Sequence, residues 1–198
     1  VYKRQVWATA FDGTGSGQNM QQFTKTNDGG DSWQSYNIDI GDLNLGVSMI
    51  HAYDDQTAWL VAYPRGANQI GGIFKTIDGG ENWVRQDSAL YNTSSSFANV
   101  VYFWDENTGF AQGDPINGEF ELYVTENGGE NWVQVPGSNI PNPLGGEYGY
   151  TRQIEINGNN VWYTTNKGRI YKSSDKGNNW VVYLSLIHIS EPTRRRGV

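Results

Sequence analysis

An eleven-residue segment occurs four times at nearly even spacing, and this repeat limits the possible folds more than any other feature of the sequence. The copies align without gaps: FTKTNDGGDSW at 23–33, IFKTIDGGENW at 73–83, LYVTENGGENW at 122–132 and IYKSSDKGNNW at 170–180. Their terminal tryptophans are 50, 49 and 48 residues apart. This period is too long for ankyrin, tetratricopeptide or leucine-rich repeats, and it suits a unit of four short strands.

A second set of aromatic residues repeats in step with the first. Trp7, Trp59, Phe110 and Trp162 follow one another at steps of 52, 51 and 52 residues, each inside an apolar run. Turn-forming residues precede the last three, and another apolar run precedes each turn. One repeat therefore predicts an inner strand, an Asx turn, a second strand, a variable loop, a third strand, a tight turn and an outer strand. The fold class predicted is all-β: a partial β-propeller of about four four-stranded antiparallel blades, the first and last incomplete.

The pattern S/T-x-D-x-G-x-x-W within each copy resembles the Asp box, or BNR repeat, of the sialidase-like propeller superfamily. Asn replaces Asp in the third copy, which is a mild departure because its amide oxygen accepts the same hydrogen bonds. The box positions are Thr26, Asp28, Gly30 and Trp33; Thr76, Asp78, Gly80 and Trp83; Thr125, Asn127, Gly129 and Trp132; and Ser173, Asp175, Gly177 and Trp180.

These boxes could be read as metal or catalytic sites, or as structural turns. A tight turn between antiparallel strands needs an Asp or Asn to accept backbone N–H groups, a Gly with positive φ and a large side chain to bury. Every box supplies all three. We therefore interpret the boxes as structural, and the resemblance implies that they lie on the face away from any active site.

Composition excludes several kinds of chemistry. The chain has no Cys and only two His residues, which excludes disulfides and thiol catalysis and disfavours zinc sites and most His-based triads. The acidic pairs at 54–55 and 105–106 lack the spacing of a calcium loop. The sequence has no run of 18 apolar residues, so no membrane span is expected. No metal and no cofactor are predicted.

Both ends of the chain differ from the repeat. Residues 1–5 and the segment SLIHISEPTR at 185–194 resemble peptides translated from sequencing-adapter read-through in assembled environmental DNA. We therefore expect a propeller fragment over 6–184, flanked by artefactual residues at 1–5 and 185–198. These ends hold five of the 14 basic and one of the 21 acidic residues, so the remainder carries a net charge of −11 instead of −7. Such an acidic chain argues against nucleic-acid binding.

Length variation indicates where a ligand would bind. From second-strand aromatic to box Trp the distances are 26, 24, 22 and 18 residues, and from box Trp to the next aromatic they are 26, 27 and 30. The variable loops, between second and third strands and between blades, share the face opposite the boxes, and variable loops on a rigid scaffold tend to carry function. The candidate ligand-binding residues on this face are Asp12, Tyr63, Arg65, Asp114, Glu147, Tyr148, Arg152 and Arg169, with Glu119 and Tyr150 as further candidates.

Two classes of function remain open. Sialidase-like enzymes carry a Phe-Arg-Ile-Pro segment, which the chain lacks, and they need three converging arginines, for which the sequence gives no support. A two-carboxylate glycoside hydrolase would need a pair drawn from Asp12, Asp114 and Glu147. No catalytic residue is assigned. Residues 103–132 more closely resemble non-catalytic propellers related to photosystem II assembly factors and large secreted bacterial BNR-repeat proteins. The expected function is a non-catalytic binding or scaffold module of a secreted, periplasmic or cell-surface bacterial protein, with a carbohydrate or protein ligand. The alternative is a fragment of a glycoside hydrolase.

Overall fold

The structure is a computed structural model that describes residues 4–89 and 91–184. It contains four antiparallel sheets, here called blades one to four, and one short 3-10 helix at Gly137–Asn139. The predicted foreign tail at 185–198 and residues 1–3 of the predicted foreign start lie outside the described residues. The partial β-propeller predicted from the repeat is confirmed.

Blade one has three strands among the described residues and each of the others has four, in sequence order across the sheet. Blade one comprises β1 (Val6–Thr9), β2 (Gln22–Thr26) and β3 (Gln34–Asn37). Blade two comprises β4 (Leu45–Ala52), β5 (Ala58–Pro64), β6 (Gly72–Thr76) and β7 (Val84–Arg85). Blade three comprises β8 (Ala98–Phe103), β9 (Gly109–Ile116), β10 (Glu119–Thr125) and β11 (Val133–Gln134). Blade four comprises β12 (Gly149–Asn157), β13 (Asn160–Thr165), β14 (Arg169–Ser173) and β15 (Trp180–Leu184), so the last sheet contains its outer strand.

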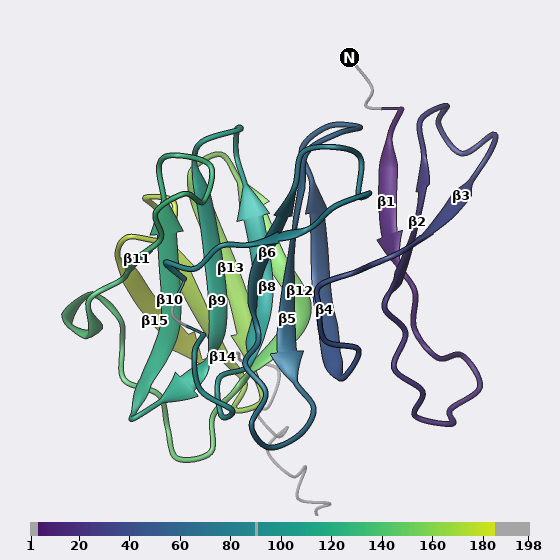
Figure 1. Cartoon of the computed structure of the whole chain (residues 1–198). Coiled ribbons are helices and arrows are strands. Elements are labelled where there is room, and N and C mark those ends of the chain that lie inside the picture. Colours follow the sequence, from purple (N-terminus) through teal and green to yellow (C-terminus); the bar gives the residue numbers. More distant parts are fainter. Residues whose placement is uncertain (1–3, 90, 185–198) are drawn as a thin grey trace, which may run out of the picture.

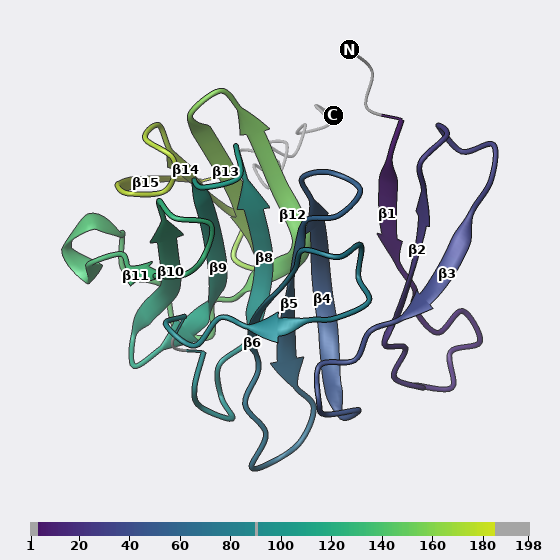
Figure 2. The same cartoon turned by 45° about the horizontal axis from the view of Figure 1, so that its top comes forward.

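The blades are arranged as an arc. Figures 1 and 2 show blade one at one end of the molecule and the inner strands β4, β8 and β12 next to one another, with later strands of each blade farther out. In Figure 1 the long β1–β2 loop lies at the lower end and the β2–β3 turn at the upper end. The Asp boxes and the variable loops therefore occupy opposite ends of the blades.

All four Asp boxes have the same hydrogen-bond pattern. In the second box the Thr76 hydroxyl donates to Asp78 Oδ1 over 2.8 Å and accepts from the Gly80 N–H over 3.0 Å, while Asp78 Oδ1 also accepts the Asn82 N–H over 2.9 Å. These bonds hold the pKa of Asp78 down at about 2, chiefly through the Asn82 N–H. In the third box Asn127 Oδ1 accepts from the Asn131 N–H over 2.9 Å, as the sequence analysis expected of its amide. The same bonds recur in the first and fourth boxes.

Each box is also tied to the turn between the first two strands of its own blade. The Gly79 N–H donates to the Gln56 carbonyl over 2.8 Å, and the equivalent bond in blade three joins Gly128 to Asn107 over 2.8 Å. In blade one the Gly29 N–H donates to the Arg4 carbonyl over 2.8 Å. Arg4, which the sequence analysis assigned to a foreign end, therefore makes the main-chain contact that belongs to this position of the repeat.

The hydrophobic cores lie between blades rather than within them. Phe23 of blade one shares a core with Leu60 and Trp83 of blade two, and comparable cores join blades two and three and blades three and four. Each box tryptophan that has a preceding blade is buried in the core shared with it: Trp83, Trp132 and Trp180 are 8%, 5% and 6% exposed. Trp33, whose blade has no predecessor among the described residues, is 47% exposed.

Lysines on third strands reinforce two of these junctions. Lys25 Nζ donates to the Gly79 carbonyl of the next blade over 2.8 Å, and Lys75 Nζ donates to the Gly128 carbonyl over 3.1 Å. At the junction of blades three and four the third-strand position holds Val124, and the box instead carries Lys176, whose Nζ lies 3.9 Å from Asp105 Oδ2. Every junction therefore contains one lysine beside a box turn.

The box hydrogen bonds give a direct prediction for Asp78→Ala. The substitution removes the acceptor for Thr76 and for Asn82, so we expect a lower melting temperature with the affinity of any ligand on the opposite face unchanged in the folded fraction. Thermal unfolding and a binding titration on the same sample test this. Exposed Asp31→Ala, in the first box turn, is the control and should leave the melting temperature unchanged. A loss of ligand affinity without a loss of stability would contradict the structural interpretation.

Candidate functional site

The end of the blades opposite the boxes holds a pocket of about 210 Å³ that joins three blades. The loop between β1 and β2 supplies its wall through Asp12 and Gln18, blade two contributes Tyr63 and Arg65, and blade four contributes Arg152. Four of the eight sequence-predicted residues therefore gather around one pocket. Sequence reasoning missed Val47 on inner strand β4, which lines the same pocket and carries no distinguishing signal in the sequence.

Arg152 reaches the pocket through an unusual backbone conformation. Its φ is +64°, and the pairing of β12 with β13 shifts register between Gly149 and Ile154. Such a left-handed, non-glycine residue at a bulge costs free energy and re-aims the side chain. The Arg152 Nε donates to the Ser48 carbonyl of blade two over 2.8 Å. Within the described residues the Arg152 side chain makes this hydrogen bond alone, through Nε. Its two terminal guanidinium nitrogens therefore remain available to a ligand.

Arg65 closes the other side of the pocket. It lies exposed in the β5–β6 loop, and its guanidinium donates to the Gly17 carbonyl of blade one over 3.0 Å. Tyr63 stacks on Phe97 with ring centroids 4.1 Å apart, which fixes its ring beneath the loop. Two guanidinium groups and one phenol thus line a pocket in a chain that is acidic overall.

Asp12 is turned toward its own loop. Its two oxygens accept hydrogen bonds from Thr14, Ser16 and the Gln18 N–H, and these bonds, those of Thr14 above all, hold the pKa of Asp12 far below its usual range. The carboxylate therefore stays ionised and stabilises the glycine-rich loop. This arrangement suits a loop anchor better than a general acid, which must hold a proton near neutral pH.

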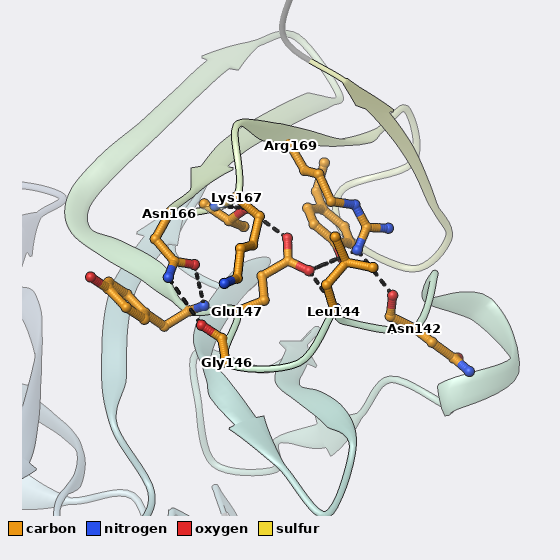
Figure 3. Close-up of polar contacts among 10 residues, drawn as sticks. Asn142, Leu144, Gly146, Glu147, Asn166, Lys167 and Arg169 are labelled. Carbon is orange, nitrogen blue, oxygen red and sulfur yellow. Dashed lines mark hydrogen bonds and ion pairs between the residues drawn. The ribbon is translucent and has the colours of Figure 1, made fainter. Parts of the chain in front are cut away.

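Glu147 and Arg169 form a separate buried cluster in blade four (Figure 3). Arg169 Nη1 lies 2.7 Å from Glu147 Oε2, and the two residues are 8% and 5% exposed. The Glu147 carboxylate also accepts hydrogen bonds from the Thr165 hydroxyl over 2.6 Å, the Leu144 N–H over 2.7 Å and the Tyr171 hydroxyl over 3.5 Å. Arg169 also donates to the Asn142 carbonyl. The cluster fixes the long β11–β12 connection, and it leaves neither charge directed at a ligand.

Asp114, which the sequence places among the variable-loop candidates, lies in strand β9 instead. Strand β9 continues to Ile116 and β10 begins at Glu119, so the loop between them is only Asn117 and Gly118, both with positive φ. Asp114 Oδ1 accepts from Asn99 Nδ2 over 2.7 Å and from the Gly149 N–H over 2.9 Å. Burial raises its pKa. Burial also raises the pKa of the neighbouring Glu121 to about 7, a buried acid that the sequence analysis did not select.

Of the remaining predicted residues, Glu119 begins strand β10 of blade three and is half-buried, while the two tyrosines lie near the surface of blade four. Tyr148 and Tyr150 are 46% and 38% exposed, with ring centroids 5.9 Å apart, and the Tyr148 N–H donates to Asn166 Oδ1 over 2.9 Å. Larger hollows of about 660 and 630 Å³ lie beside the outer strands of blades one and two. The first has no basic or aromatic side chain in its lining, and in the second Arg85 is bound to Asp87 and Gly71.

The described residues show neither a metal cluster nor a membrane-spanning helix. No group of three or more His, Cys, Asp or Glu side chains in 4–89 and 91–184 is placed to hold an ion. Within the same ranges, no helix is long and apolar enough to cross a bilayer.

Comparison with known families identifies the repeat. The family model described as photosynthesis system II assembly factor YCF48 matches residues 66–185. The chain belongs to this YCF48 family. The match includes blades three and four and the last two strands of blade two, and with them Arg152 of the pocket but not Arg65.

Solved structures agree with the YCF48 assignment. A structure of YCF48 bound to D1 peptide is 27% identical, with a TM-score of 0.52, over 70% of this chain and 39% of that chain. YCF48 from Cyanidioschyzon merolae is 18% identical, with a TM-score of 0.56, over 92% of this chain and 57% of that chain. The GH74 xyloglucanase from Xanthomonas campestris is 14% identical, with a TM-score of 0.55, over 83% of this chain and 28% of that chain, and shares the fold alone. This chain thus spans less than two thirds of each of these proteins. No curated protein matches the sequence significantly.

Proposed function

We propose that this YCF48-family chain is a non-catalytic module that binds an acidic peptide segment of a protein partner at the pocket of Arg65 and Arg152. The observation that carries the proposal is the convergence of two guanidinium groups from blades two and four on one pocket. Guanidinium groups bind carboxylates through paired hydrogen bonds, and they keep their charge at every physiological pH. The 27% identical relative bound to a D1 peptide supports a protein ligand rather than a carbohydrate.

The engagement of Asp12, the candidate carboxylate that lines the pocket, by its own loop supports a binding role rather than glycoside hydrolysis. A glycoside hydrolase of this fold would need two carboxylates facing one substrate. Of the three candidate carboxylates, only Asp12 lines the pocket, and its oxygens are engaged by its own loop. Asp114 is bonded to Asn99, and Glu147 to Arg169. A secreted, periplasmic or cell-surface location in a bacterium is also part of this proposal.

Arg152→Gln and Arg65→Gln should each weaken peptide binding. A hydrogen bond to a charged group contributes about 1.5–3 kcal/mol, so each loss should raise Kd roughly tenfold to a hundredfold. Fluorescence anisotropy with a labelled D1 peptide and with an unrelated acidic peptide measures the effect. Affinity should also fall as salt is raised, because the ligand's charge is screened.

Arg85→Gln is the matched control. It removes the same charge from blade two, but from an outer strand where Arg85 pairs with Asp87. The control should bind like the unaltered chain. Equal affinity of all three variants for either peptide would overturn the proposed site, and hydrolysis of xyloglucan by the unaltered chain would overturn the non-catalytic role.

A further inference from the structure

The inner strand of blade four contains a wide bulge that the inner strands of blades two and three lack. Residues 150–153 of β12 lie opposite the single residue Thr164, whereas at the same place in β4 and in β8 two residues lie opposite one. All four residues of this segment, here called the β12 bulge, are exposed. Bulges redirect side chains and are frequent beside functional sites. The extra length of β12 therefore marks a place where side chains leave the regular sheet.

Tyr150 and Arg152 both belong to the β12 bulge. Arg152 lines the pocket at the loop end of the blades, and Tyr150, two residues earlier, is 38% exposed. The bulge is tied to its own blade because the Thr164 hydroxyl donates to Gln153 Oε1 over 2.9 Å, and to blade two because Arg152 Nε donates to the Ser48 carbonyl. One short segment, held on two sides, thus presents an aromatic ring and a guanidinium group.

Tyr148, just before the bulge, is exposed because of the residue that blade three places beside it. Its main chain pairs with Asn166, and the residue at the same position of blade three is Phe97, one residue before the pair of Ala98 with the second strand. The Phe97 ring stacks on Tyr63 of the preceding blade with centroids 4.1 Å apart. Blade three has Asp114 at the position of Tyr63, so Tyr148 has no equivalent ring to stack on and is 46% exposed.

Tyr148 and Tyr150, here called the tyrosine pair, form a fixed aromatic surface. Their ring planes are 80° apart, in an edge-to-face contact. Asn166 holds the main chain of Tyr148 from both directions, since its Oδ1 accepts the Tyr148 N–H and its own N–H donates to the Tyr148 carbonyl over 3.1 Å. The preceding residue, Glu147, is anchored by its buried ion pair with Arg169 (Figure 3). Such preorganisation lowers the entropy cost of binding a ligand.

We propose that the tyrosine pair binds an aromatic side chain of the same peptide whose acidic residue binds Arg152. This assignment rests on the proposed function and extends it to a ligand motif in which the acidic and the aromatic residue are two positions apart. An extended peptide advances about 3.3 Å per residue, and its residues i and i+2 point to the same side. A peptide lying along the β12 bulge therefore brings its acid to Arg152 and its ring to Tyr150, which are separated by the same two-residue step.

Two labelled peptides that differ in one residue test this motif by fluorescence anisotropy. Each has a single glutamate in a glycine–serine background, and two positions away on either side one peptide carries phenylalanine and the other alanine. The unaltered chain should bind the phenylalanine peptide about five- to thirtyfold more tightly, because a third ring is buried against the tyrosine pair. The double variant Tyr148→Ala, Tyr150→Ala should lose this preference by weakening the phenylalanine peptide alone. Both side chains are exposed, so thermal unfolding should be unchanged.

Tyr183→Ala is the matched control, since Tyr183 is a similarly exposed tyrosine, at 56%, on outer strand β15 of the same blade. It should bind both peptides like the unaltered chain. Equal affinity of the unaltered chain for the two peptides, or a preference that survives in the double variant, would refute the aromatic site. Displacement of the phenylalanine peptide by a xyloglucan oligosaccharide would assign the tyrosine pair to a sugar and equally refute it.

Arg152→Gln separates this motif from the proposed function. If the aromatic preference is absent but Arg152→Gln still weakens both peptides, the acidic pocket stands and only the tyrosine pair is wrongly assigned. If Arg152→Gln binds both peptides like the unaltered chain, the proposed function fails, and the two-residue motif built on it fails as well.

Discussion

Arg169→Leu should lower the free energy of unfolding by about 3–5 kcal/mol, the usual cost of removing one partner from a buried ion pair. The carboxylate of Glu147 is fully buried in the pair, and the substitution would leave it without the guanidinium 2.7 Å away. Urea unfolding followed by tryptophan fluorescence measures the change. The Glu147→Gln and Arg169→Leu double variant removes both charges and should recover part of the loss.

The exposed pair of Arg85 and Asp87 is the control for this prediction. Its nitrogen–oxygen distance is 3.0 Å, but the side chains are 29% and 89% exposed. Such pairs contribute at most about 1 kcal/mol, so Asp87→Asn, which leaves the Arg85 hydrogen bonds to the Gly71 carbonyl in place, should change stability little. Comparable losses for Arg169→Leu and Asp87→Asn would show that the blade-four cluster in Figure 3 does not fix the β11–β12 connection.

Gly80→Ala should lower stability by about 2–5 kcal/mol, of which strain at positive φ accounts for about 1–3 and overpacking for the rest. Gly80 has a φ of +93°, and an added Cβ would meet the rings of Phe23 and Trp7 on the preceding blade. Thermal and urea unfolding measure the loss.

Gly30→Ala is the matched control in the first box. Its φ of +102° is as unfavourable, but the nearest atoms to an added Cβ belong to Trp33 at 3.8 Å. The control should therefore lose only the stability that backbone strain costs. The difference in stability between the two variants then measures how tightly a box packs on the preceding blade. If both substitutions cost the same, the preceding blade does not restrict this position.

The repeat was sufficient to predict the fold because each box encodes its own turn. Thr76, Asp78 and Gly80 bond to one another within a few residues, so the local sequence determines the local structure. The even spacing of the boxes then predicted four blades over this sequence, and the uneven spacing between boxes and second-strand aromatics indicated the end at which loops vary. The pattern could not predict that Trp33 is exposed, because the motif has the same sequence whether or not another blade covers it.

The pocket was predicted only in part. Loop length indicated the end of the blades at which this pocket lies and led to Tyr63, Arg65 and Arg152. The contact of Arg152 with Ser48 joins residues 104 apart through a bulge with positive φ, and no spacing rule anticipates it. Glu147 and Arg169 were selected as ligand-facing charges, whereas the structure pairs them with each other. Whether the pocket residues bind a ligand, and where the protein is located, stay predictions.

The interblade lysines have a consequence for how such arrays can grow. Lys25 and Lys75 each donate a hydrogen bond to the Asp-box turn of the following blade. The sequence repeat, which includes its own turn, is therefore offset from the packing unit, which joins a lysine to the turn of the next repeat. A duplication of blade two from its inner to its outer strand would place the copied Gly79 turn beside a lysine, and the copied Lys75 would lie beside the turn that follows. Such a copy of blade two would need no compensating lysine substitution at either junction.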